Sequence, residues 1–185
     1  AGTSLAGKTL VVTAGGTREP IDPVRFLGNK SSGRQGLAIA AAAARAGARV
    51  RVIAANIDDS VMACLPSSVE VTRVGSAQQM REATLAQVRG ADALVMTAAV
   101  ADFRPEATHA SKMKKDPSTS DAPTLRLVRN PDILSEVGHS VTRPPLVVGF
   151  AAETGTDEEI LAYGAEKAAR KGADYIALNR VGAGV

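Results

Sequence analysis

The sequence contains no tryptophan, and aromatic residues make up only 3% of its 185 residues. A hydrophobic core must therefore be built from alanine, valine, leucine and isoleucine. The single cysteine, Cys64, excludes an internal disulfide, which is typical of proteins from a reducing cytoplasm. No apolar run approaches the roughly 20 residues of a membrane-spanning helix, and no signal peptide is recognisable. These absences predict a cytoplasmic protein that does not act in a membrane.

The charge of the chain is small for a protein that binds nucleic acid. The formal net charge is +3, and no basic run is interleaved with aromatic residues, which argues against nucleic acid as a partner. A weakly positive chain suits an anionic small molecule instead. With 185 residues and no internal repeat or linker, we expect one α/β domain over residues 1–185. Because the sequence begins at Ala1 without Met, we expect this domain to be part of a longer chain.

Apolar, β-branched segments alternate with helical ones along the whole chain. We expect strands at residues 9–13, 48–54, 69–74, 91–98, 125–128, 146–150 and 175–178. We expect helices at residues 36–47, 77–89 and 157–171, and a short one that follows a cap at 130–132 and ends near 137. Strands that alternate with helices predict an α/β fold with a mostly parallel, Rossmann-like sheet and helices on both of its faces.

Ligands of such sheets bind beyond the carboxyl ends of the strands, where the strand order reverses. Four loops with small or polar residues follow strands in this chain, at residues 15–33, 98–104, 129–132 and 150–154. We therefore expect these loops to meet at one rim of the sheet. The polar stretch at 104–123 is expected to be a loop with a short lysine segment.

The loop after the first strand has the composition of an anion-binding loop. Gly15 allows close approach of backbone, Thr17 offers a hydroxyl, Arg25 a cation, and Asn29 an amide that both donates and accepts. The loop ends on Ser31, Ser32 and Gly33, where a helix begins, and helix N-termini favour phosphate. We assign Gly15, Thr17, Arg25 and Asn29 to phosphate or substrate binding.

Later segments supply a flat, small-residue surface and further charges. Ala98 and its small neighbours at a strand end leave room for a planar ring, and Asp102 is suited to a metal ion or a ribose hydroxyl. Lys112 is suited to neutralise a triphosphate or charge in a transition state. Lys167 and Lys171 are four residues apart and share one face of a helix.

An oxidoreductase is the main alternative from the residues themselves. The glycine-rich turn before the first helix looks like that of NAD(P)-dependent short-chain dehydrogenases, and Tyr163 and Lys167 form a Tyr-x-x-x-Lys pair. However, that turn lies 18 residues beyond Thr13, whereas a dinucleotide fingerprint follows its strand directly. No acidic residue follows the second strand until Asp58, and no serine precedes Tyr163 at the spacing that this family requires. A non-catalytic regulatory partner with the same fold is a third hypothesis.

Five segments taken together resemble a known family. In order they are TAGGTREPIDPVRFLGNKSSGRQG, AAVADFRP, KMKK, VRNPDIL and VGFAAETG. They resemble phosphopantothenate–cysteine ligase, which in most bacteria is the C-terminal half of a bifunctional coenzyme A protein. The resemblance implies that CTP and Mg²⁺ activate 4′-phosphopantothenate as an acyl-cytidylate, which L-cysteine then attacks. It also implies a homodimer, and a flavin-dependent decarboxylase domain preceding this one in the full chain, so that no FMN site is expected within these residues.

The resemblance assigns roles to individual residues. It implies that Asn29 and Lys112 are catalytic, Asn29 by hydrogen bonding during turnover of the acyl-cytidylate and Lys112 by contacting the nucleotide. It places Asp102 at the nucleotide and its metal ion. The complete nucleotide-binding set that it implies is Ala98, Asp102, Lys112, Asn130, Pro131, Phe150, Lys167 and Lys171. The sequence departs from the family by stopping soon after Arg180, where the family continues with further strands and a helix.

Overall fold

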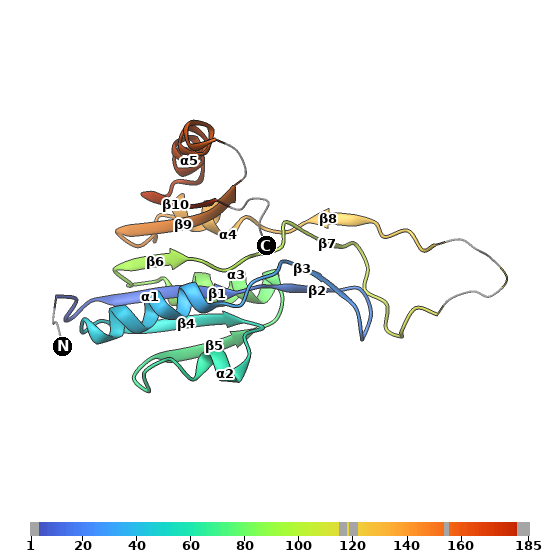
Figure 1. The fold of residues 1–185 in the computed structure, drawn as a ribbon, viewed down its shortest axis with the longest axis horizontal. Coiled ribbons are helices and arrows are strands. Elements are labelled where there is room, and N and C mark those ends of the chain that lie inside the picture. The colour runs from blue at the N-terminus through green and yellow to red at the C-terminus, as the bar shows by residue number, and fades with distance from the viewer. Residues whose placement is uncertain (1–3, 115–117, 119–121, 154–155, 181–185) are drawn as a thin grey trace.

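The computed structural model describes residues 4–114, 118, 122–153 and 156–180 (Figure 1). Its main feature is a six-stranded parallel sheet with the strand order β10-β9-β6-β1-β4-β5. These strands are β1 (Thr9–Gly15), β4 (Arg49–Ala55), β5 (Glu70–Val74), β6 (Ala93–Met96), β9 (Leu146–Glu153) and β10 (Tyr175–Arg180). After β5 the chain returns to β6 on the other side of β1, so the strand order reverses between β1 and β6.

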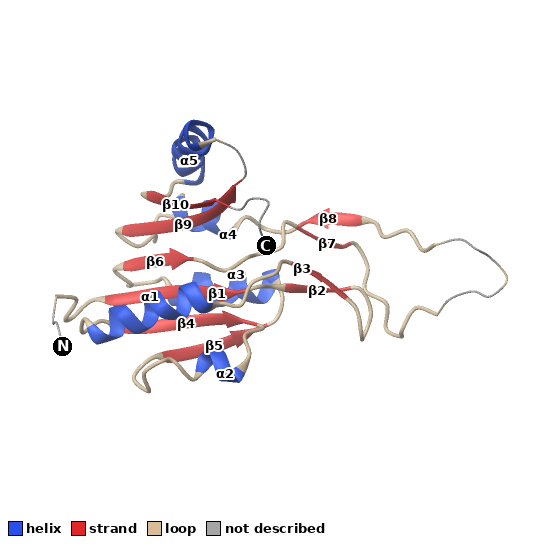
Figure 2. Cartoon of the chain, viewed as in Figure 1, coloured by secondary structure: helices blue, strands red, loops and turns tan. Residues whose placement is uncertain are grey.

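Helices cover both faces of this sheet (Figure 2). They are α1 (Arg34–Arg45), α2 (Asp59–Met62), α3 (Ala77–Gln87), α4 (Ile133–Gly138) and α5 (Asp157–Lys171). Three of them begin at a residue whose side chain accepts a backbone N–H of the first turn, as N-caps do: Ser76 for α3, Asp132 for α4 and Thr156 for α5. The sequence pattern thus sets where these helices start.

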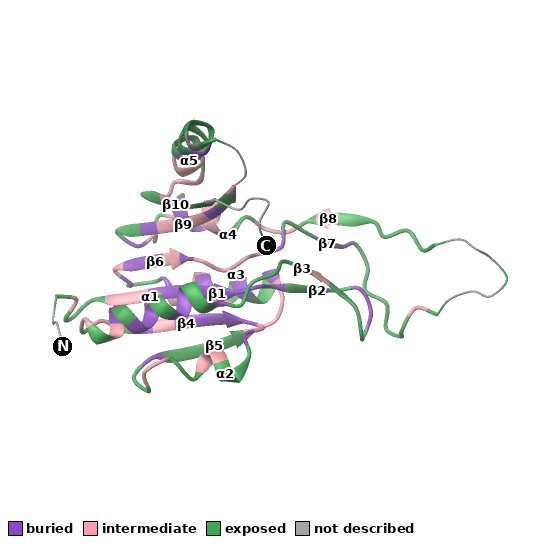
Figure 3. Ribbon diagram, in the orientation of Figure 1, coloured by how far each residue is buried: buried purple, intermediate pink, exposed green. Residues whose placement is uncertain are grey.

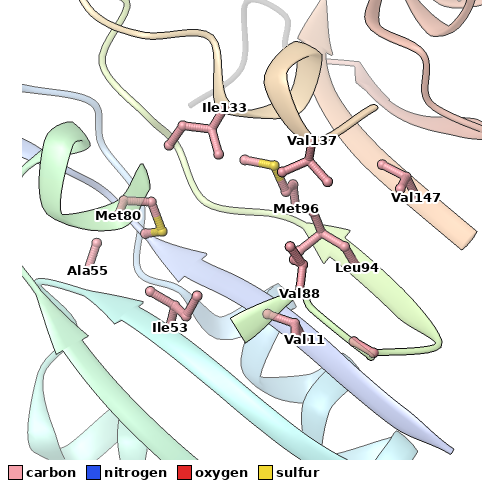
Figure 4. Packing of buried hydrophobic residues seen from close by; sticks show 11 residues of the cluster. Val11, Ile53, Ala55, Met80, Val88, Leu94, Met96, Ile133, Val137 and Val147 are labelled. Atoms are coloured by element: carbon pink, nitrogen blue, oxygen red, sulfur yellow. The ribbon is translucent and has the colours of Figure 1, made fainter. Parts of the chain in front are cut away.

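Two apolar clusters hold the helices on the sheet. On one face, Met80 of α3 and Ile133 and Val137 of α4 pack against Val11, Leu94 and their neighbours in the strands (Figure 4). On the other face, alanines of α1 pack on β1 and β4 with Leu37. Because alanine is small, α1 lies close to the sheet, and the core needs no aromatic residue. The central strands are the most deeply buried part of the chain (Figure 3).

Two short antiparallel hairpins extend beyond the carboxyl ends of the sheet strands, at the right of Figure 1. One pairs β2 (Arg18–Pro20) with β3 (Phe26–Gly28), and the other pairs β7 (Phe103–Pro105) with β8 (Leu127–Arg129). We call these four strands, with the described residues that connect each pair, the arm. Most of the arm is exposed (Figure 3). It therefore owes its shape to hydrogen bonds more than to a core of its own.

The expected α/β fold, its parallel sheet and its helices on both faces are confirmed. Every expected strand and helix is present, with bounds that differ by at most three residues. Three expectations need correction. The strand expected at 125–128 belongs to the arm and not to the main sheet. The short elements β2, β3, β7 and α2 were not expected. Helix α1 starts at Arg34, two residues before the expected start, and follows a left-handed Gly33 that makes no side-chain cap. Among the described residues, no helix is long and apolar enough to cross a membrane.

Candidate nucleotide and substrate site

A cleft of about 480 Å³ opens at the carboxyl ends of β6 and β9, beside the point where the strand order reverses. This volume lies in the range of about 300–1,000 Å³ that small-molecule sites occupy. Segments 96–103 and 129–134 line it together with Phe150 of β9 and the last turns of α5. Seven residues assigned to a nucleotide line this cleft: Ala98, Asp102, Asn130, Pro131, Phe150, Lys167 and Lys171. Three of the four expected loops therefore contribute to one cavity, although Thr154 of the last loop lies outside the described residues.

The cleft is rich in positive charge. Arg129, Lys167, Arg170 and Lys171 line it, against the two carboxylates of Asp102 and Asp132. Ala98, Val100 and Phe150 contribute apolar surface to the same cleft. A cavity that combines cations with small and aromatic side chains suits a ligand that carries phosphates and a flat ring.

The two lysines of α5 are each held by a carboxylate. Lys167 Nζ lies 3.4 Å from Glu153 Oε1, at the end of β9, and 5.3 Å from the centre of the Tyr163 ring. Lys171 Nζ forms an ion pair with Asp132. Burial raises the pKa of Asp132, but the Lys171 ammonium and the Ser135 N–H outweigh it and leave that pKa below its usual range. The Asp132 carboxylate is therefore charged at neutral pH, and its ion pair holds Lys171 at the edge of the cleft.

Asn130 joins two of the cleft segments. Its side-chain Nδ2 donates to the Ala101 carbonyl at 2.8 Å, and its backbone N–H donates to the Asp102 carbonyl at 2.8 Å. Its Oδ1 accepts from Arg104 Nη1 at 3.1 Å. With the amide engaged on both sides, Asn130 fixes the spacing between segment 98–104 and segment 129–132. A substitution here is therefore expected to change the shape of the cleft as well as its polarity.

Asp102 is an exposed carboxylate at the cleft wall. No group of three or more His, Cys, Asp or Glu side chains that could hold a metal ion exists within the described part of the chain. A metal held by protein ligands alone is therefore not supported there. Mg²⁺, by contrast, commonly uses one or two carboxylates together with substrate phosphates and water. A single exposed carboxylate in a cleft that also holds cationic side chains fits that mode of binding.

The loop after β1 supports the cleft from behind and does not line it. Thr17 is fully buried, and its hydroxyl oxygen accepts the Ala101 N–H at 2.9 Å. Gly15 has φ of +87° and lies directly against the Ala55 carbonyl. Thr17 therefore fixes the backbone of a cleft residue, whereas Gly15 packs against β4. The assignment of both residues to phosphate or substrate binding stays a prediction.

The two residues assigned to catalysis do not line the cleft of their own chain. Asn29 is exposed, and its Nδ2 lies 3.5 Å from the carbonyl oxygen of Val100, a cleft residue, so it stands at the rim. Lys112 is exposed on the arm. Lys115, the last residue of the lysine segment, lies outside the described residues. The cleft of one chain thus brings together the nucleotide residues but not Lys112.

Arg25 is occupied by contacts within the arm. Its side chain forms an ion pair with Asp22 and donates to the Met113 carbonyl at 3.3 Å. Asp22 is only 3% exposed and also accepts the N–H groups of Val24, Arg25 and Met113. Burial raises the pKa of Asp22, but these hydrogen bonds and the Arg25 guanidinium outweigh it and lower that pKa to about 2. The assignment of Arg25 to phosphate or substrate binding stays a prediction.

Sequence reasoning missed two cations of the cleft, Arg129 and Arg170. Arg170 is three residues beyond Lys167 and so shares its helix face, which is a signal that the spacing contained. Arg129 directly precedes Asn130 at the end of β8, and no periodicity marks it. Arg170 also lies 3.1 Å from Glu166, so that its charge is partly balanced.

The geometry does not favour the oxidoreductase alternative. Tyr163 is not among the residues that line the cleft. Lys167 sits over the Tyr163 ring face, and its ammonium is shared with Glu153. A tyrosine that donates its hydroxyl proton to a bound carbonyl must reach the cavity that holds the substrate.

The fold and the cleft define a Rossmann-like α/β domain with a cationic ligand cavity at the carboxyl ends of its strands. The chain matches the family described as the DNA/pantothenate metabolism flavoprotein C-terminal domain over residues 5–185, and it belongs to this family. The resemblance drawn from the sequence segments is thereby confirmed at the level of the family.

Individual relatives agree with this assignment. The chain is 48% identical over 186 residues to the coenzyme A biosynthesis bifunctional protein CoaBC of Mycobacterium tuberculosis (strain ATCC 25618 / H37Rv), covering 97% of this chain and 43% of that protein. It is 43% identical over 177 residues to the CoaBC protein of Vibrio parahaemolyticus, covering 96% of this chain and 42% of that protein. The chain therefore spans less than half the length of these relatives.

Solved structures share the fold. The C-terminal domain of a coenzyme A biosynthesis bifunctional protein CoaBC superposes with a TM-score of 0.78 at 36% identity, covering 96% of this chain and 79% of that one. A Cab2 H337A variant in complex with phosphopantothenate-cysteine gives a TM-score of 0.71 at 16% identity, covering 94% of this chain and 73% of that one. At 16% identity, the similarity to the Cab2 variant concerns the fold alone.

Proposed function

We propose that this domain is a phosphopantothenate–cysteine ligase of coenzyme A biosynthesis, with CTP as the activating nucleotide. The observation that carries the proposal is the cleft, in which seven residues assigned to a nucleotide, two of them lysines, meet from separate parts of the chain with two further cations, Arg129 and Arg170. The family of the chain, and the naming of its relatives as coenzyme A biosynthesis proteins, support the same reaction. We further propose that a flavin-dependent decarboxylase domain precedes this one in the natural chain.

The reaction requires a carboxylate to become an acyl donor. A carboxylate oxygen of 4′-phosphopantothenate attacks the α-phosphorus of CTP, and the bond to pyrophosphate breaks. The cysteine amine then attacks the acyl carbon, the bond to CMP breaks, and the amine loses a proton. Both steps build negative charge on oxygen, which fixed cations in a water-poor site stabilise.

The cleft residues divide these tasks in our proposal. Lys167 and Lys171, with Arg129 and Arg170, bind the phosphates, while Ala98 and Phe150 flank the base. Asp102 is the residue that would hold Mg²⁺, which would supply positive charge close to the phosphates. Asn29, at the rim beside Val100, hydrogen-bonds the acyl group during turnover.

The proposal extends to a homodimer formed through the arm. Five apolar side chains of the arm are between 36% and 61% exposed: Val24, Phe26, Phe103, Leu125 and Leu127. Exposed apolar side chains that gather on one part of a protein are typical of an interface. A second copy of the chain is the occupant that we propose, because Lys112 stands on this arm and outside its own cleft. In the dimer that we propose, a partner copy brings Lys112 of its arm to the cleft, which Lys112 of the same chain does not line.

We expect the natural chain at its full length to release pyrophosphate when 4′-phosphopantothenate and CTP are added with Mg²⁺. Each nucleoside triphosphate is supplied in turn, with cysteine withheld and then added, and pyrophosphate and CMP are measured separately. Cysteine is expected to be needed for CMP release and for repeated turnover. Release that does not depend on phosphopantothenate would contradict a ligase, and a preference for ATP would refute CTP as the activating nucleotide. Equal turnover by Asn29→Ala would argue for a regulatory partner or for another catalytic group.

Phe26→Ser is expected to shift the protein from dimer to monomer at micromolar concentration. The change removes a half-exposed ring from the arm, where its other face already contacts Arg18 at 4.7 Å. Sedimentation equilibrium measures the mass. The matched control is Val141→Ser, which replaces a fully exposed apolar side chain outside the arm and is expected to leave the mass unchanged. A wild-type chain that is monomeric throughout this range refutes the dimer.

A further inference from the structure

A buried carboxylate on the arm binds the lysine segment, although nothing in the reaction requires a charge at that place. Asp22 lies in the turn between β2 and β3 and is only 3% exposed. Burying a carboxylate is costly unless it is paired and hydrogen-bonded. Asp22 meets this condition with partners from two segments that are some 90 residues apart in the sequence. Its contacts therefore hold distant parts of the chain together.

The two oxygens of Asp22 serve different purposes. Oδ1 accepts the N–H groups of Val24 at 2.9 Å and Arg25 at 2.8 Å, which closes the turn. Oδ2 accepts the Met113 N–H at 3.2 Å and the Arg25 guanidinium. The same guanidinium donates to the Met113 carbonyl at 3.3 Å. One oxygen thus shapes the turn. The other oxygen binds the N–H of Met113, the residue after Lys112, and Arg25 binds the carbonyl of Met113.

Two further hydrogen bonds place the segment before Lys112 along the same hairpin. The His109 N–H donates to the Ile21 carbonyl at 2.9 Å, and the Thr108 hydroxyl donates to the Pro20 carbonyl at 3.2 Å. Lys112 itself is exposed. The hydrogen bonds on either side of Lys112 hold its backbone on the hairpin, and among those named here from the described residues the charged partners are Asp22 and Arg25.

We infer that Asp22 is a positioning residue that fixes segment 108–114 on the β2–β3 turn and thereby orients Lys112 for the nucleotide. The part of this inference that concerns the nucleotide rests on the proposed function. The part that concerns the segment stands on the hydrogen bonds alone. Asp22 remains ionised throughout the neutral range, since its pKa is lowered to about 2, so its hold on Arg25 and Met113 does not vary there.

Asp22→Asn separates the two tasks of this side chain. Asparagine has one acceptor oxygen and one NH₂ group. With the oxygen in the turn, the NH₂ group faces the Met113 N–H and the Arg25 guanidinium, both of which are donors. The turn is then retained while the grip on segment 108–114 is lost. The control is Asp59→Asn, which removes a carboxylate from an exposed ion pair with Arg73, away from the arm.

Hydrogen exchange read by mass spectrometry tests the first part. Peptides covering 108–114 are expected to exchange roughly tenfold faster in Asp22→Asn, the effect of losing about one charge-assisted hydrogen bond. Asp59→Asn is expected to leave them unchanged. If Asp22→Asn does not fold, Thr108→Val provides a milder loosening of the same segment with the same expected direction. Unchanged exchange in a folded Asp22→Asn protein overturns the inference, whatever the catalytic activity.

A double-mutant cycle with Lys112 tests the second part. Asp22→Asn is expected to lower kcat/KM for CTP roughly tenfold in the natural chain and to have almost no further effect in Lys112→Ala, because the residue that it positions is gone. Additive losses mean that Asp22 acts through something other than Lys112 and overturn the positioning role. Full activity of Lys112→Ala itself refutes the proposed part of Lys112 in the reaction, while the exchange experiment still decides whether Asp22 holds the segment.

Discussion

Replacing Lys167 and Lys171 together by methionine is expected to weaken CTP binding by roughly a hundredfold or more. Both ammonium groups line the cleft from one face of α5, and each charge-assisted hydrogen bond contributes about 1.5–3 kcal/mol. Methionine keeps the length and apolar stem of lysine, so packing along α5 is largely preserved. Isothermal titration with CTP and Mg²⁺ measures the dissociation constant directly. The control is Lys8→Met, since Lys8 pairs with Asp92 near the amino ends of the strands.

The two single variants are expected to differ. Lys171→Met leaves the cleft carboxylate of Asp132 without its lysine partner. Lys167→Met leaves Glu153 without its lysine partner, but Glu153 does not line the cleft. An unpaired carboxylate in the cavity repels phosphate, so Lys171→Met is expected to bind CTP more weakly than Lys167→Met. Adding Asp132→Asn to Lys171→Met is expected to restore part of the loss. If the dissociation constant of the variant that lacks both Lys167 and Lys171 stays within threefold of that of the natural protein, the two lysines do not bind the triphosphate.

The cleft residues were accessible to sequence reasoning because parallel strands end at the same edge of a sheet. Asp102 follows β6, and Phe150 lies in the carboxyl-terminal half of β9, two parallel strands whose ends converge. Asn130 follows β8 of the arm, so the parallel sheet alone does not explain its place in the cleft. Lys171 was identified because its spacing from Lys167 places both on one helix face. Sequence patterns therefore predicted cleft residues where a helix or a parallel strand determines their position.

The arm was not predictable in the same way. Its strands are three residues long, and β7 pairs with β8 across an intervening stretch of more than twenty residues, so no period in the sequence marks the pairing. The contact of Asp22 with Met113 is equally remote. Sequence reasoning treated Arg25 as a free cation and Thr17 as a free hydroxyl. Their partners, Met113 and Ala101, come from segments whose position only the folded chain determines.

Gly15→Ala is expected to destabilise the fold by roughly 3 kcal/mol or more, which lowers the melting temperature by about 6–12 °C. A Cβ at this position would lie 2.0 Å from the Ala55 carbonyl oxygen and 2.7 Å from Ile57 Cγ1. That carbonyl belongs to β4 and accepts the Gly16 N–H at 3.1 Å, so it cannot withdraw without breaking the sheet edge. The φ of +87° adds strain for any residue with a side chain. Thermal unfolding followed by circular dichroism measures the change.

Gly90→Ala is the control that separates the two causes. Gly90 also has a positive φ, of +71°, but no atom lies within 4 Å of a Cβ built there. It therefore carries the conformational strain alone, which is about 1–2 kcal/mol. If Gly15 served only to let a phosphate approach the backbone, Gly15→Ala would melt like Gly90→Ala and lose only ligand affinity. A melting temperature well below that of Gly90→Ala, in the absence of any ligand, assigns Gly15 to the close contact between β1 and β4.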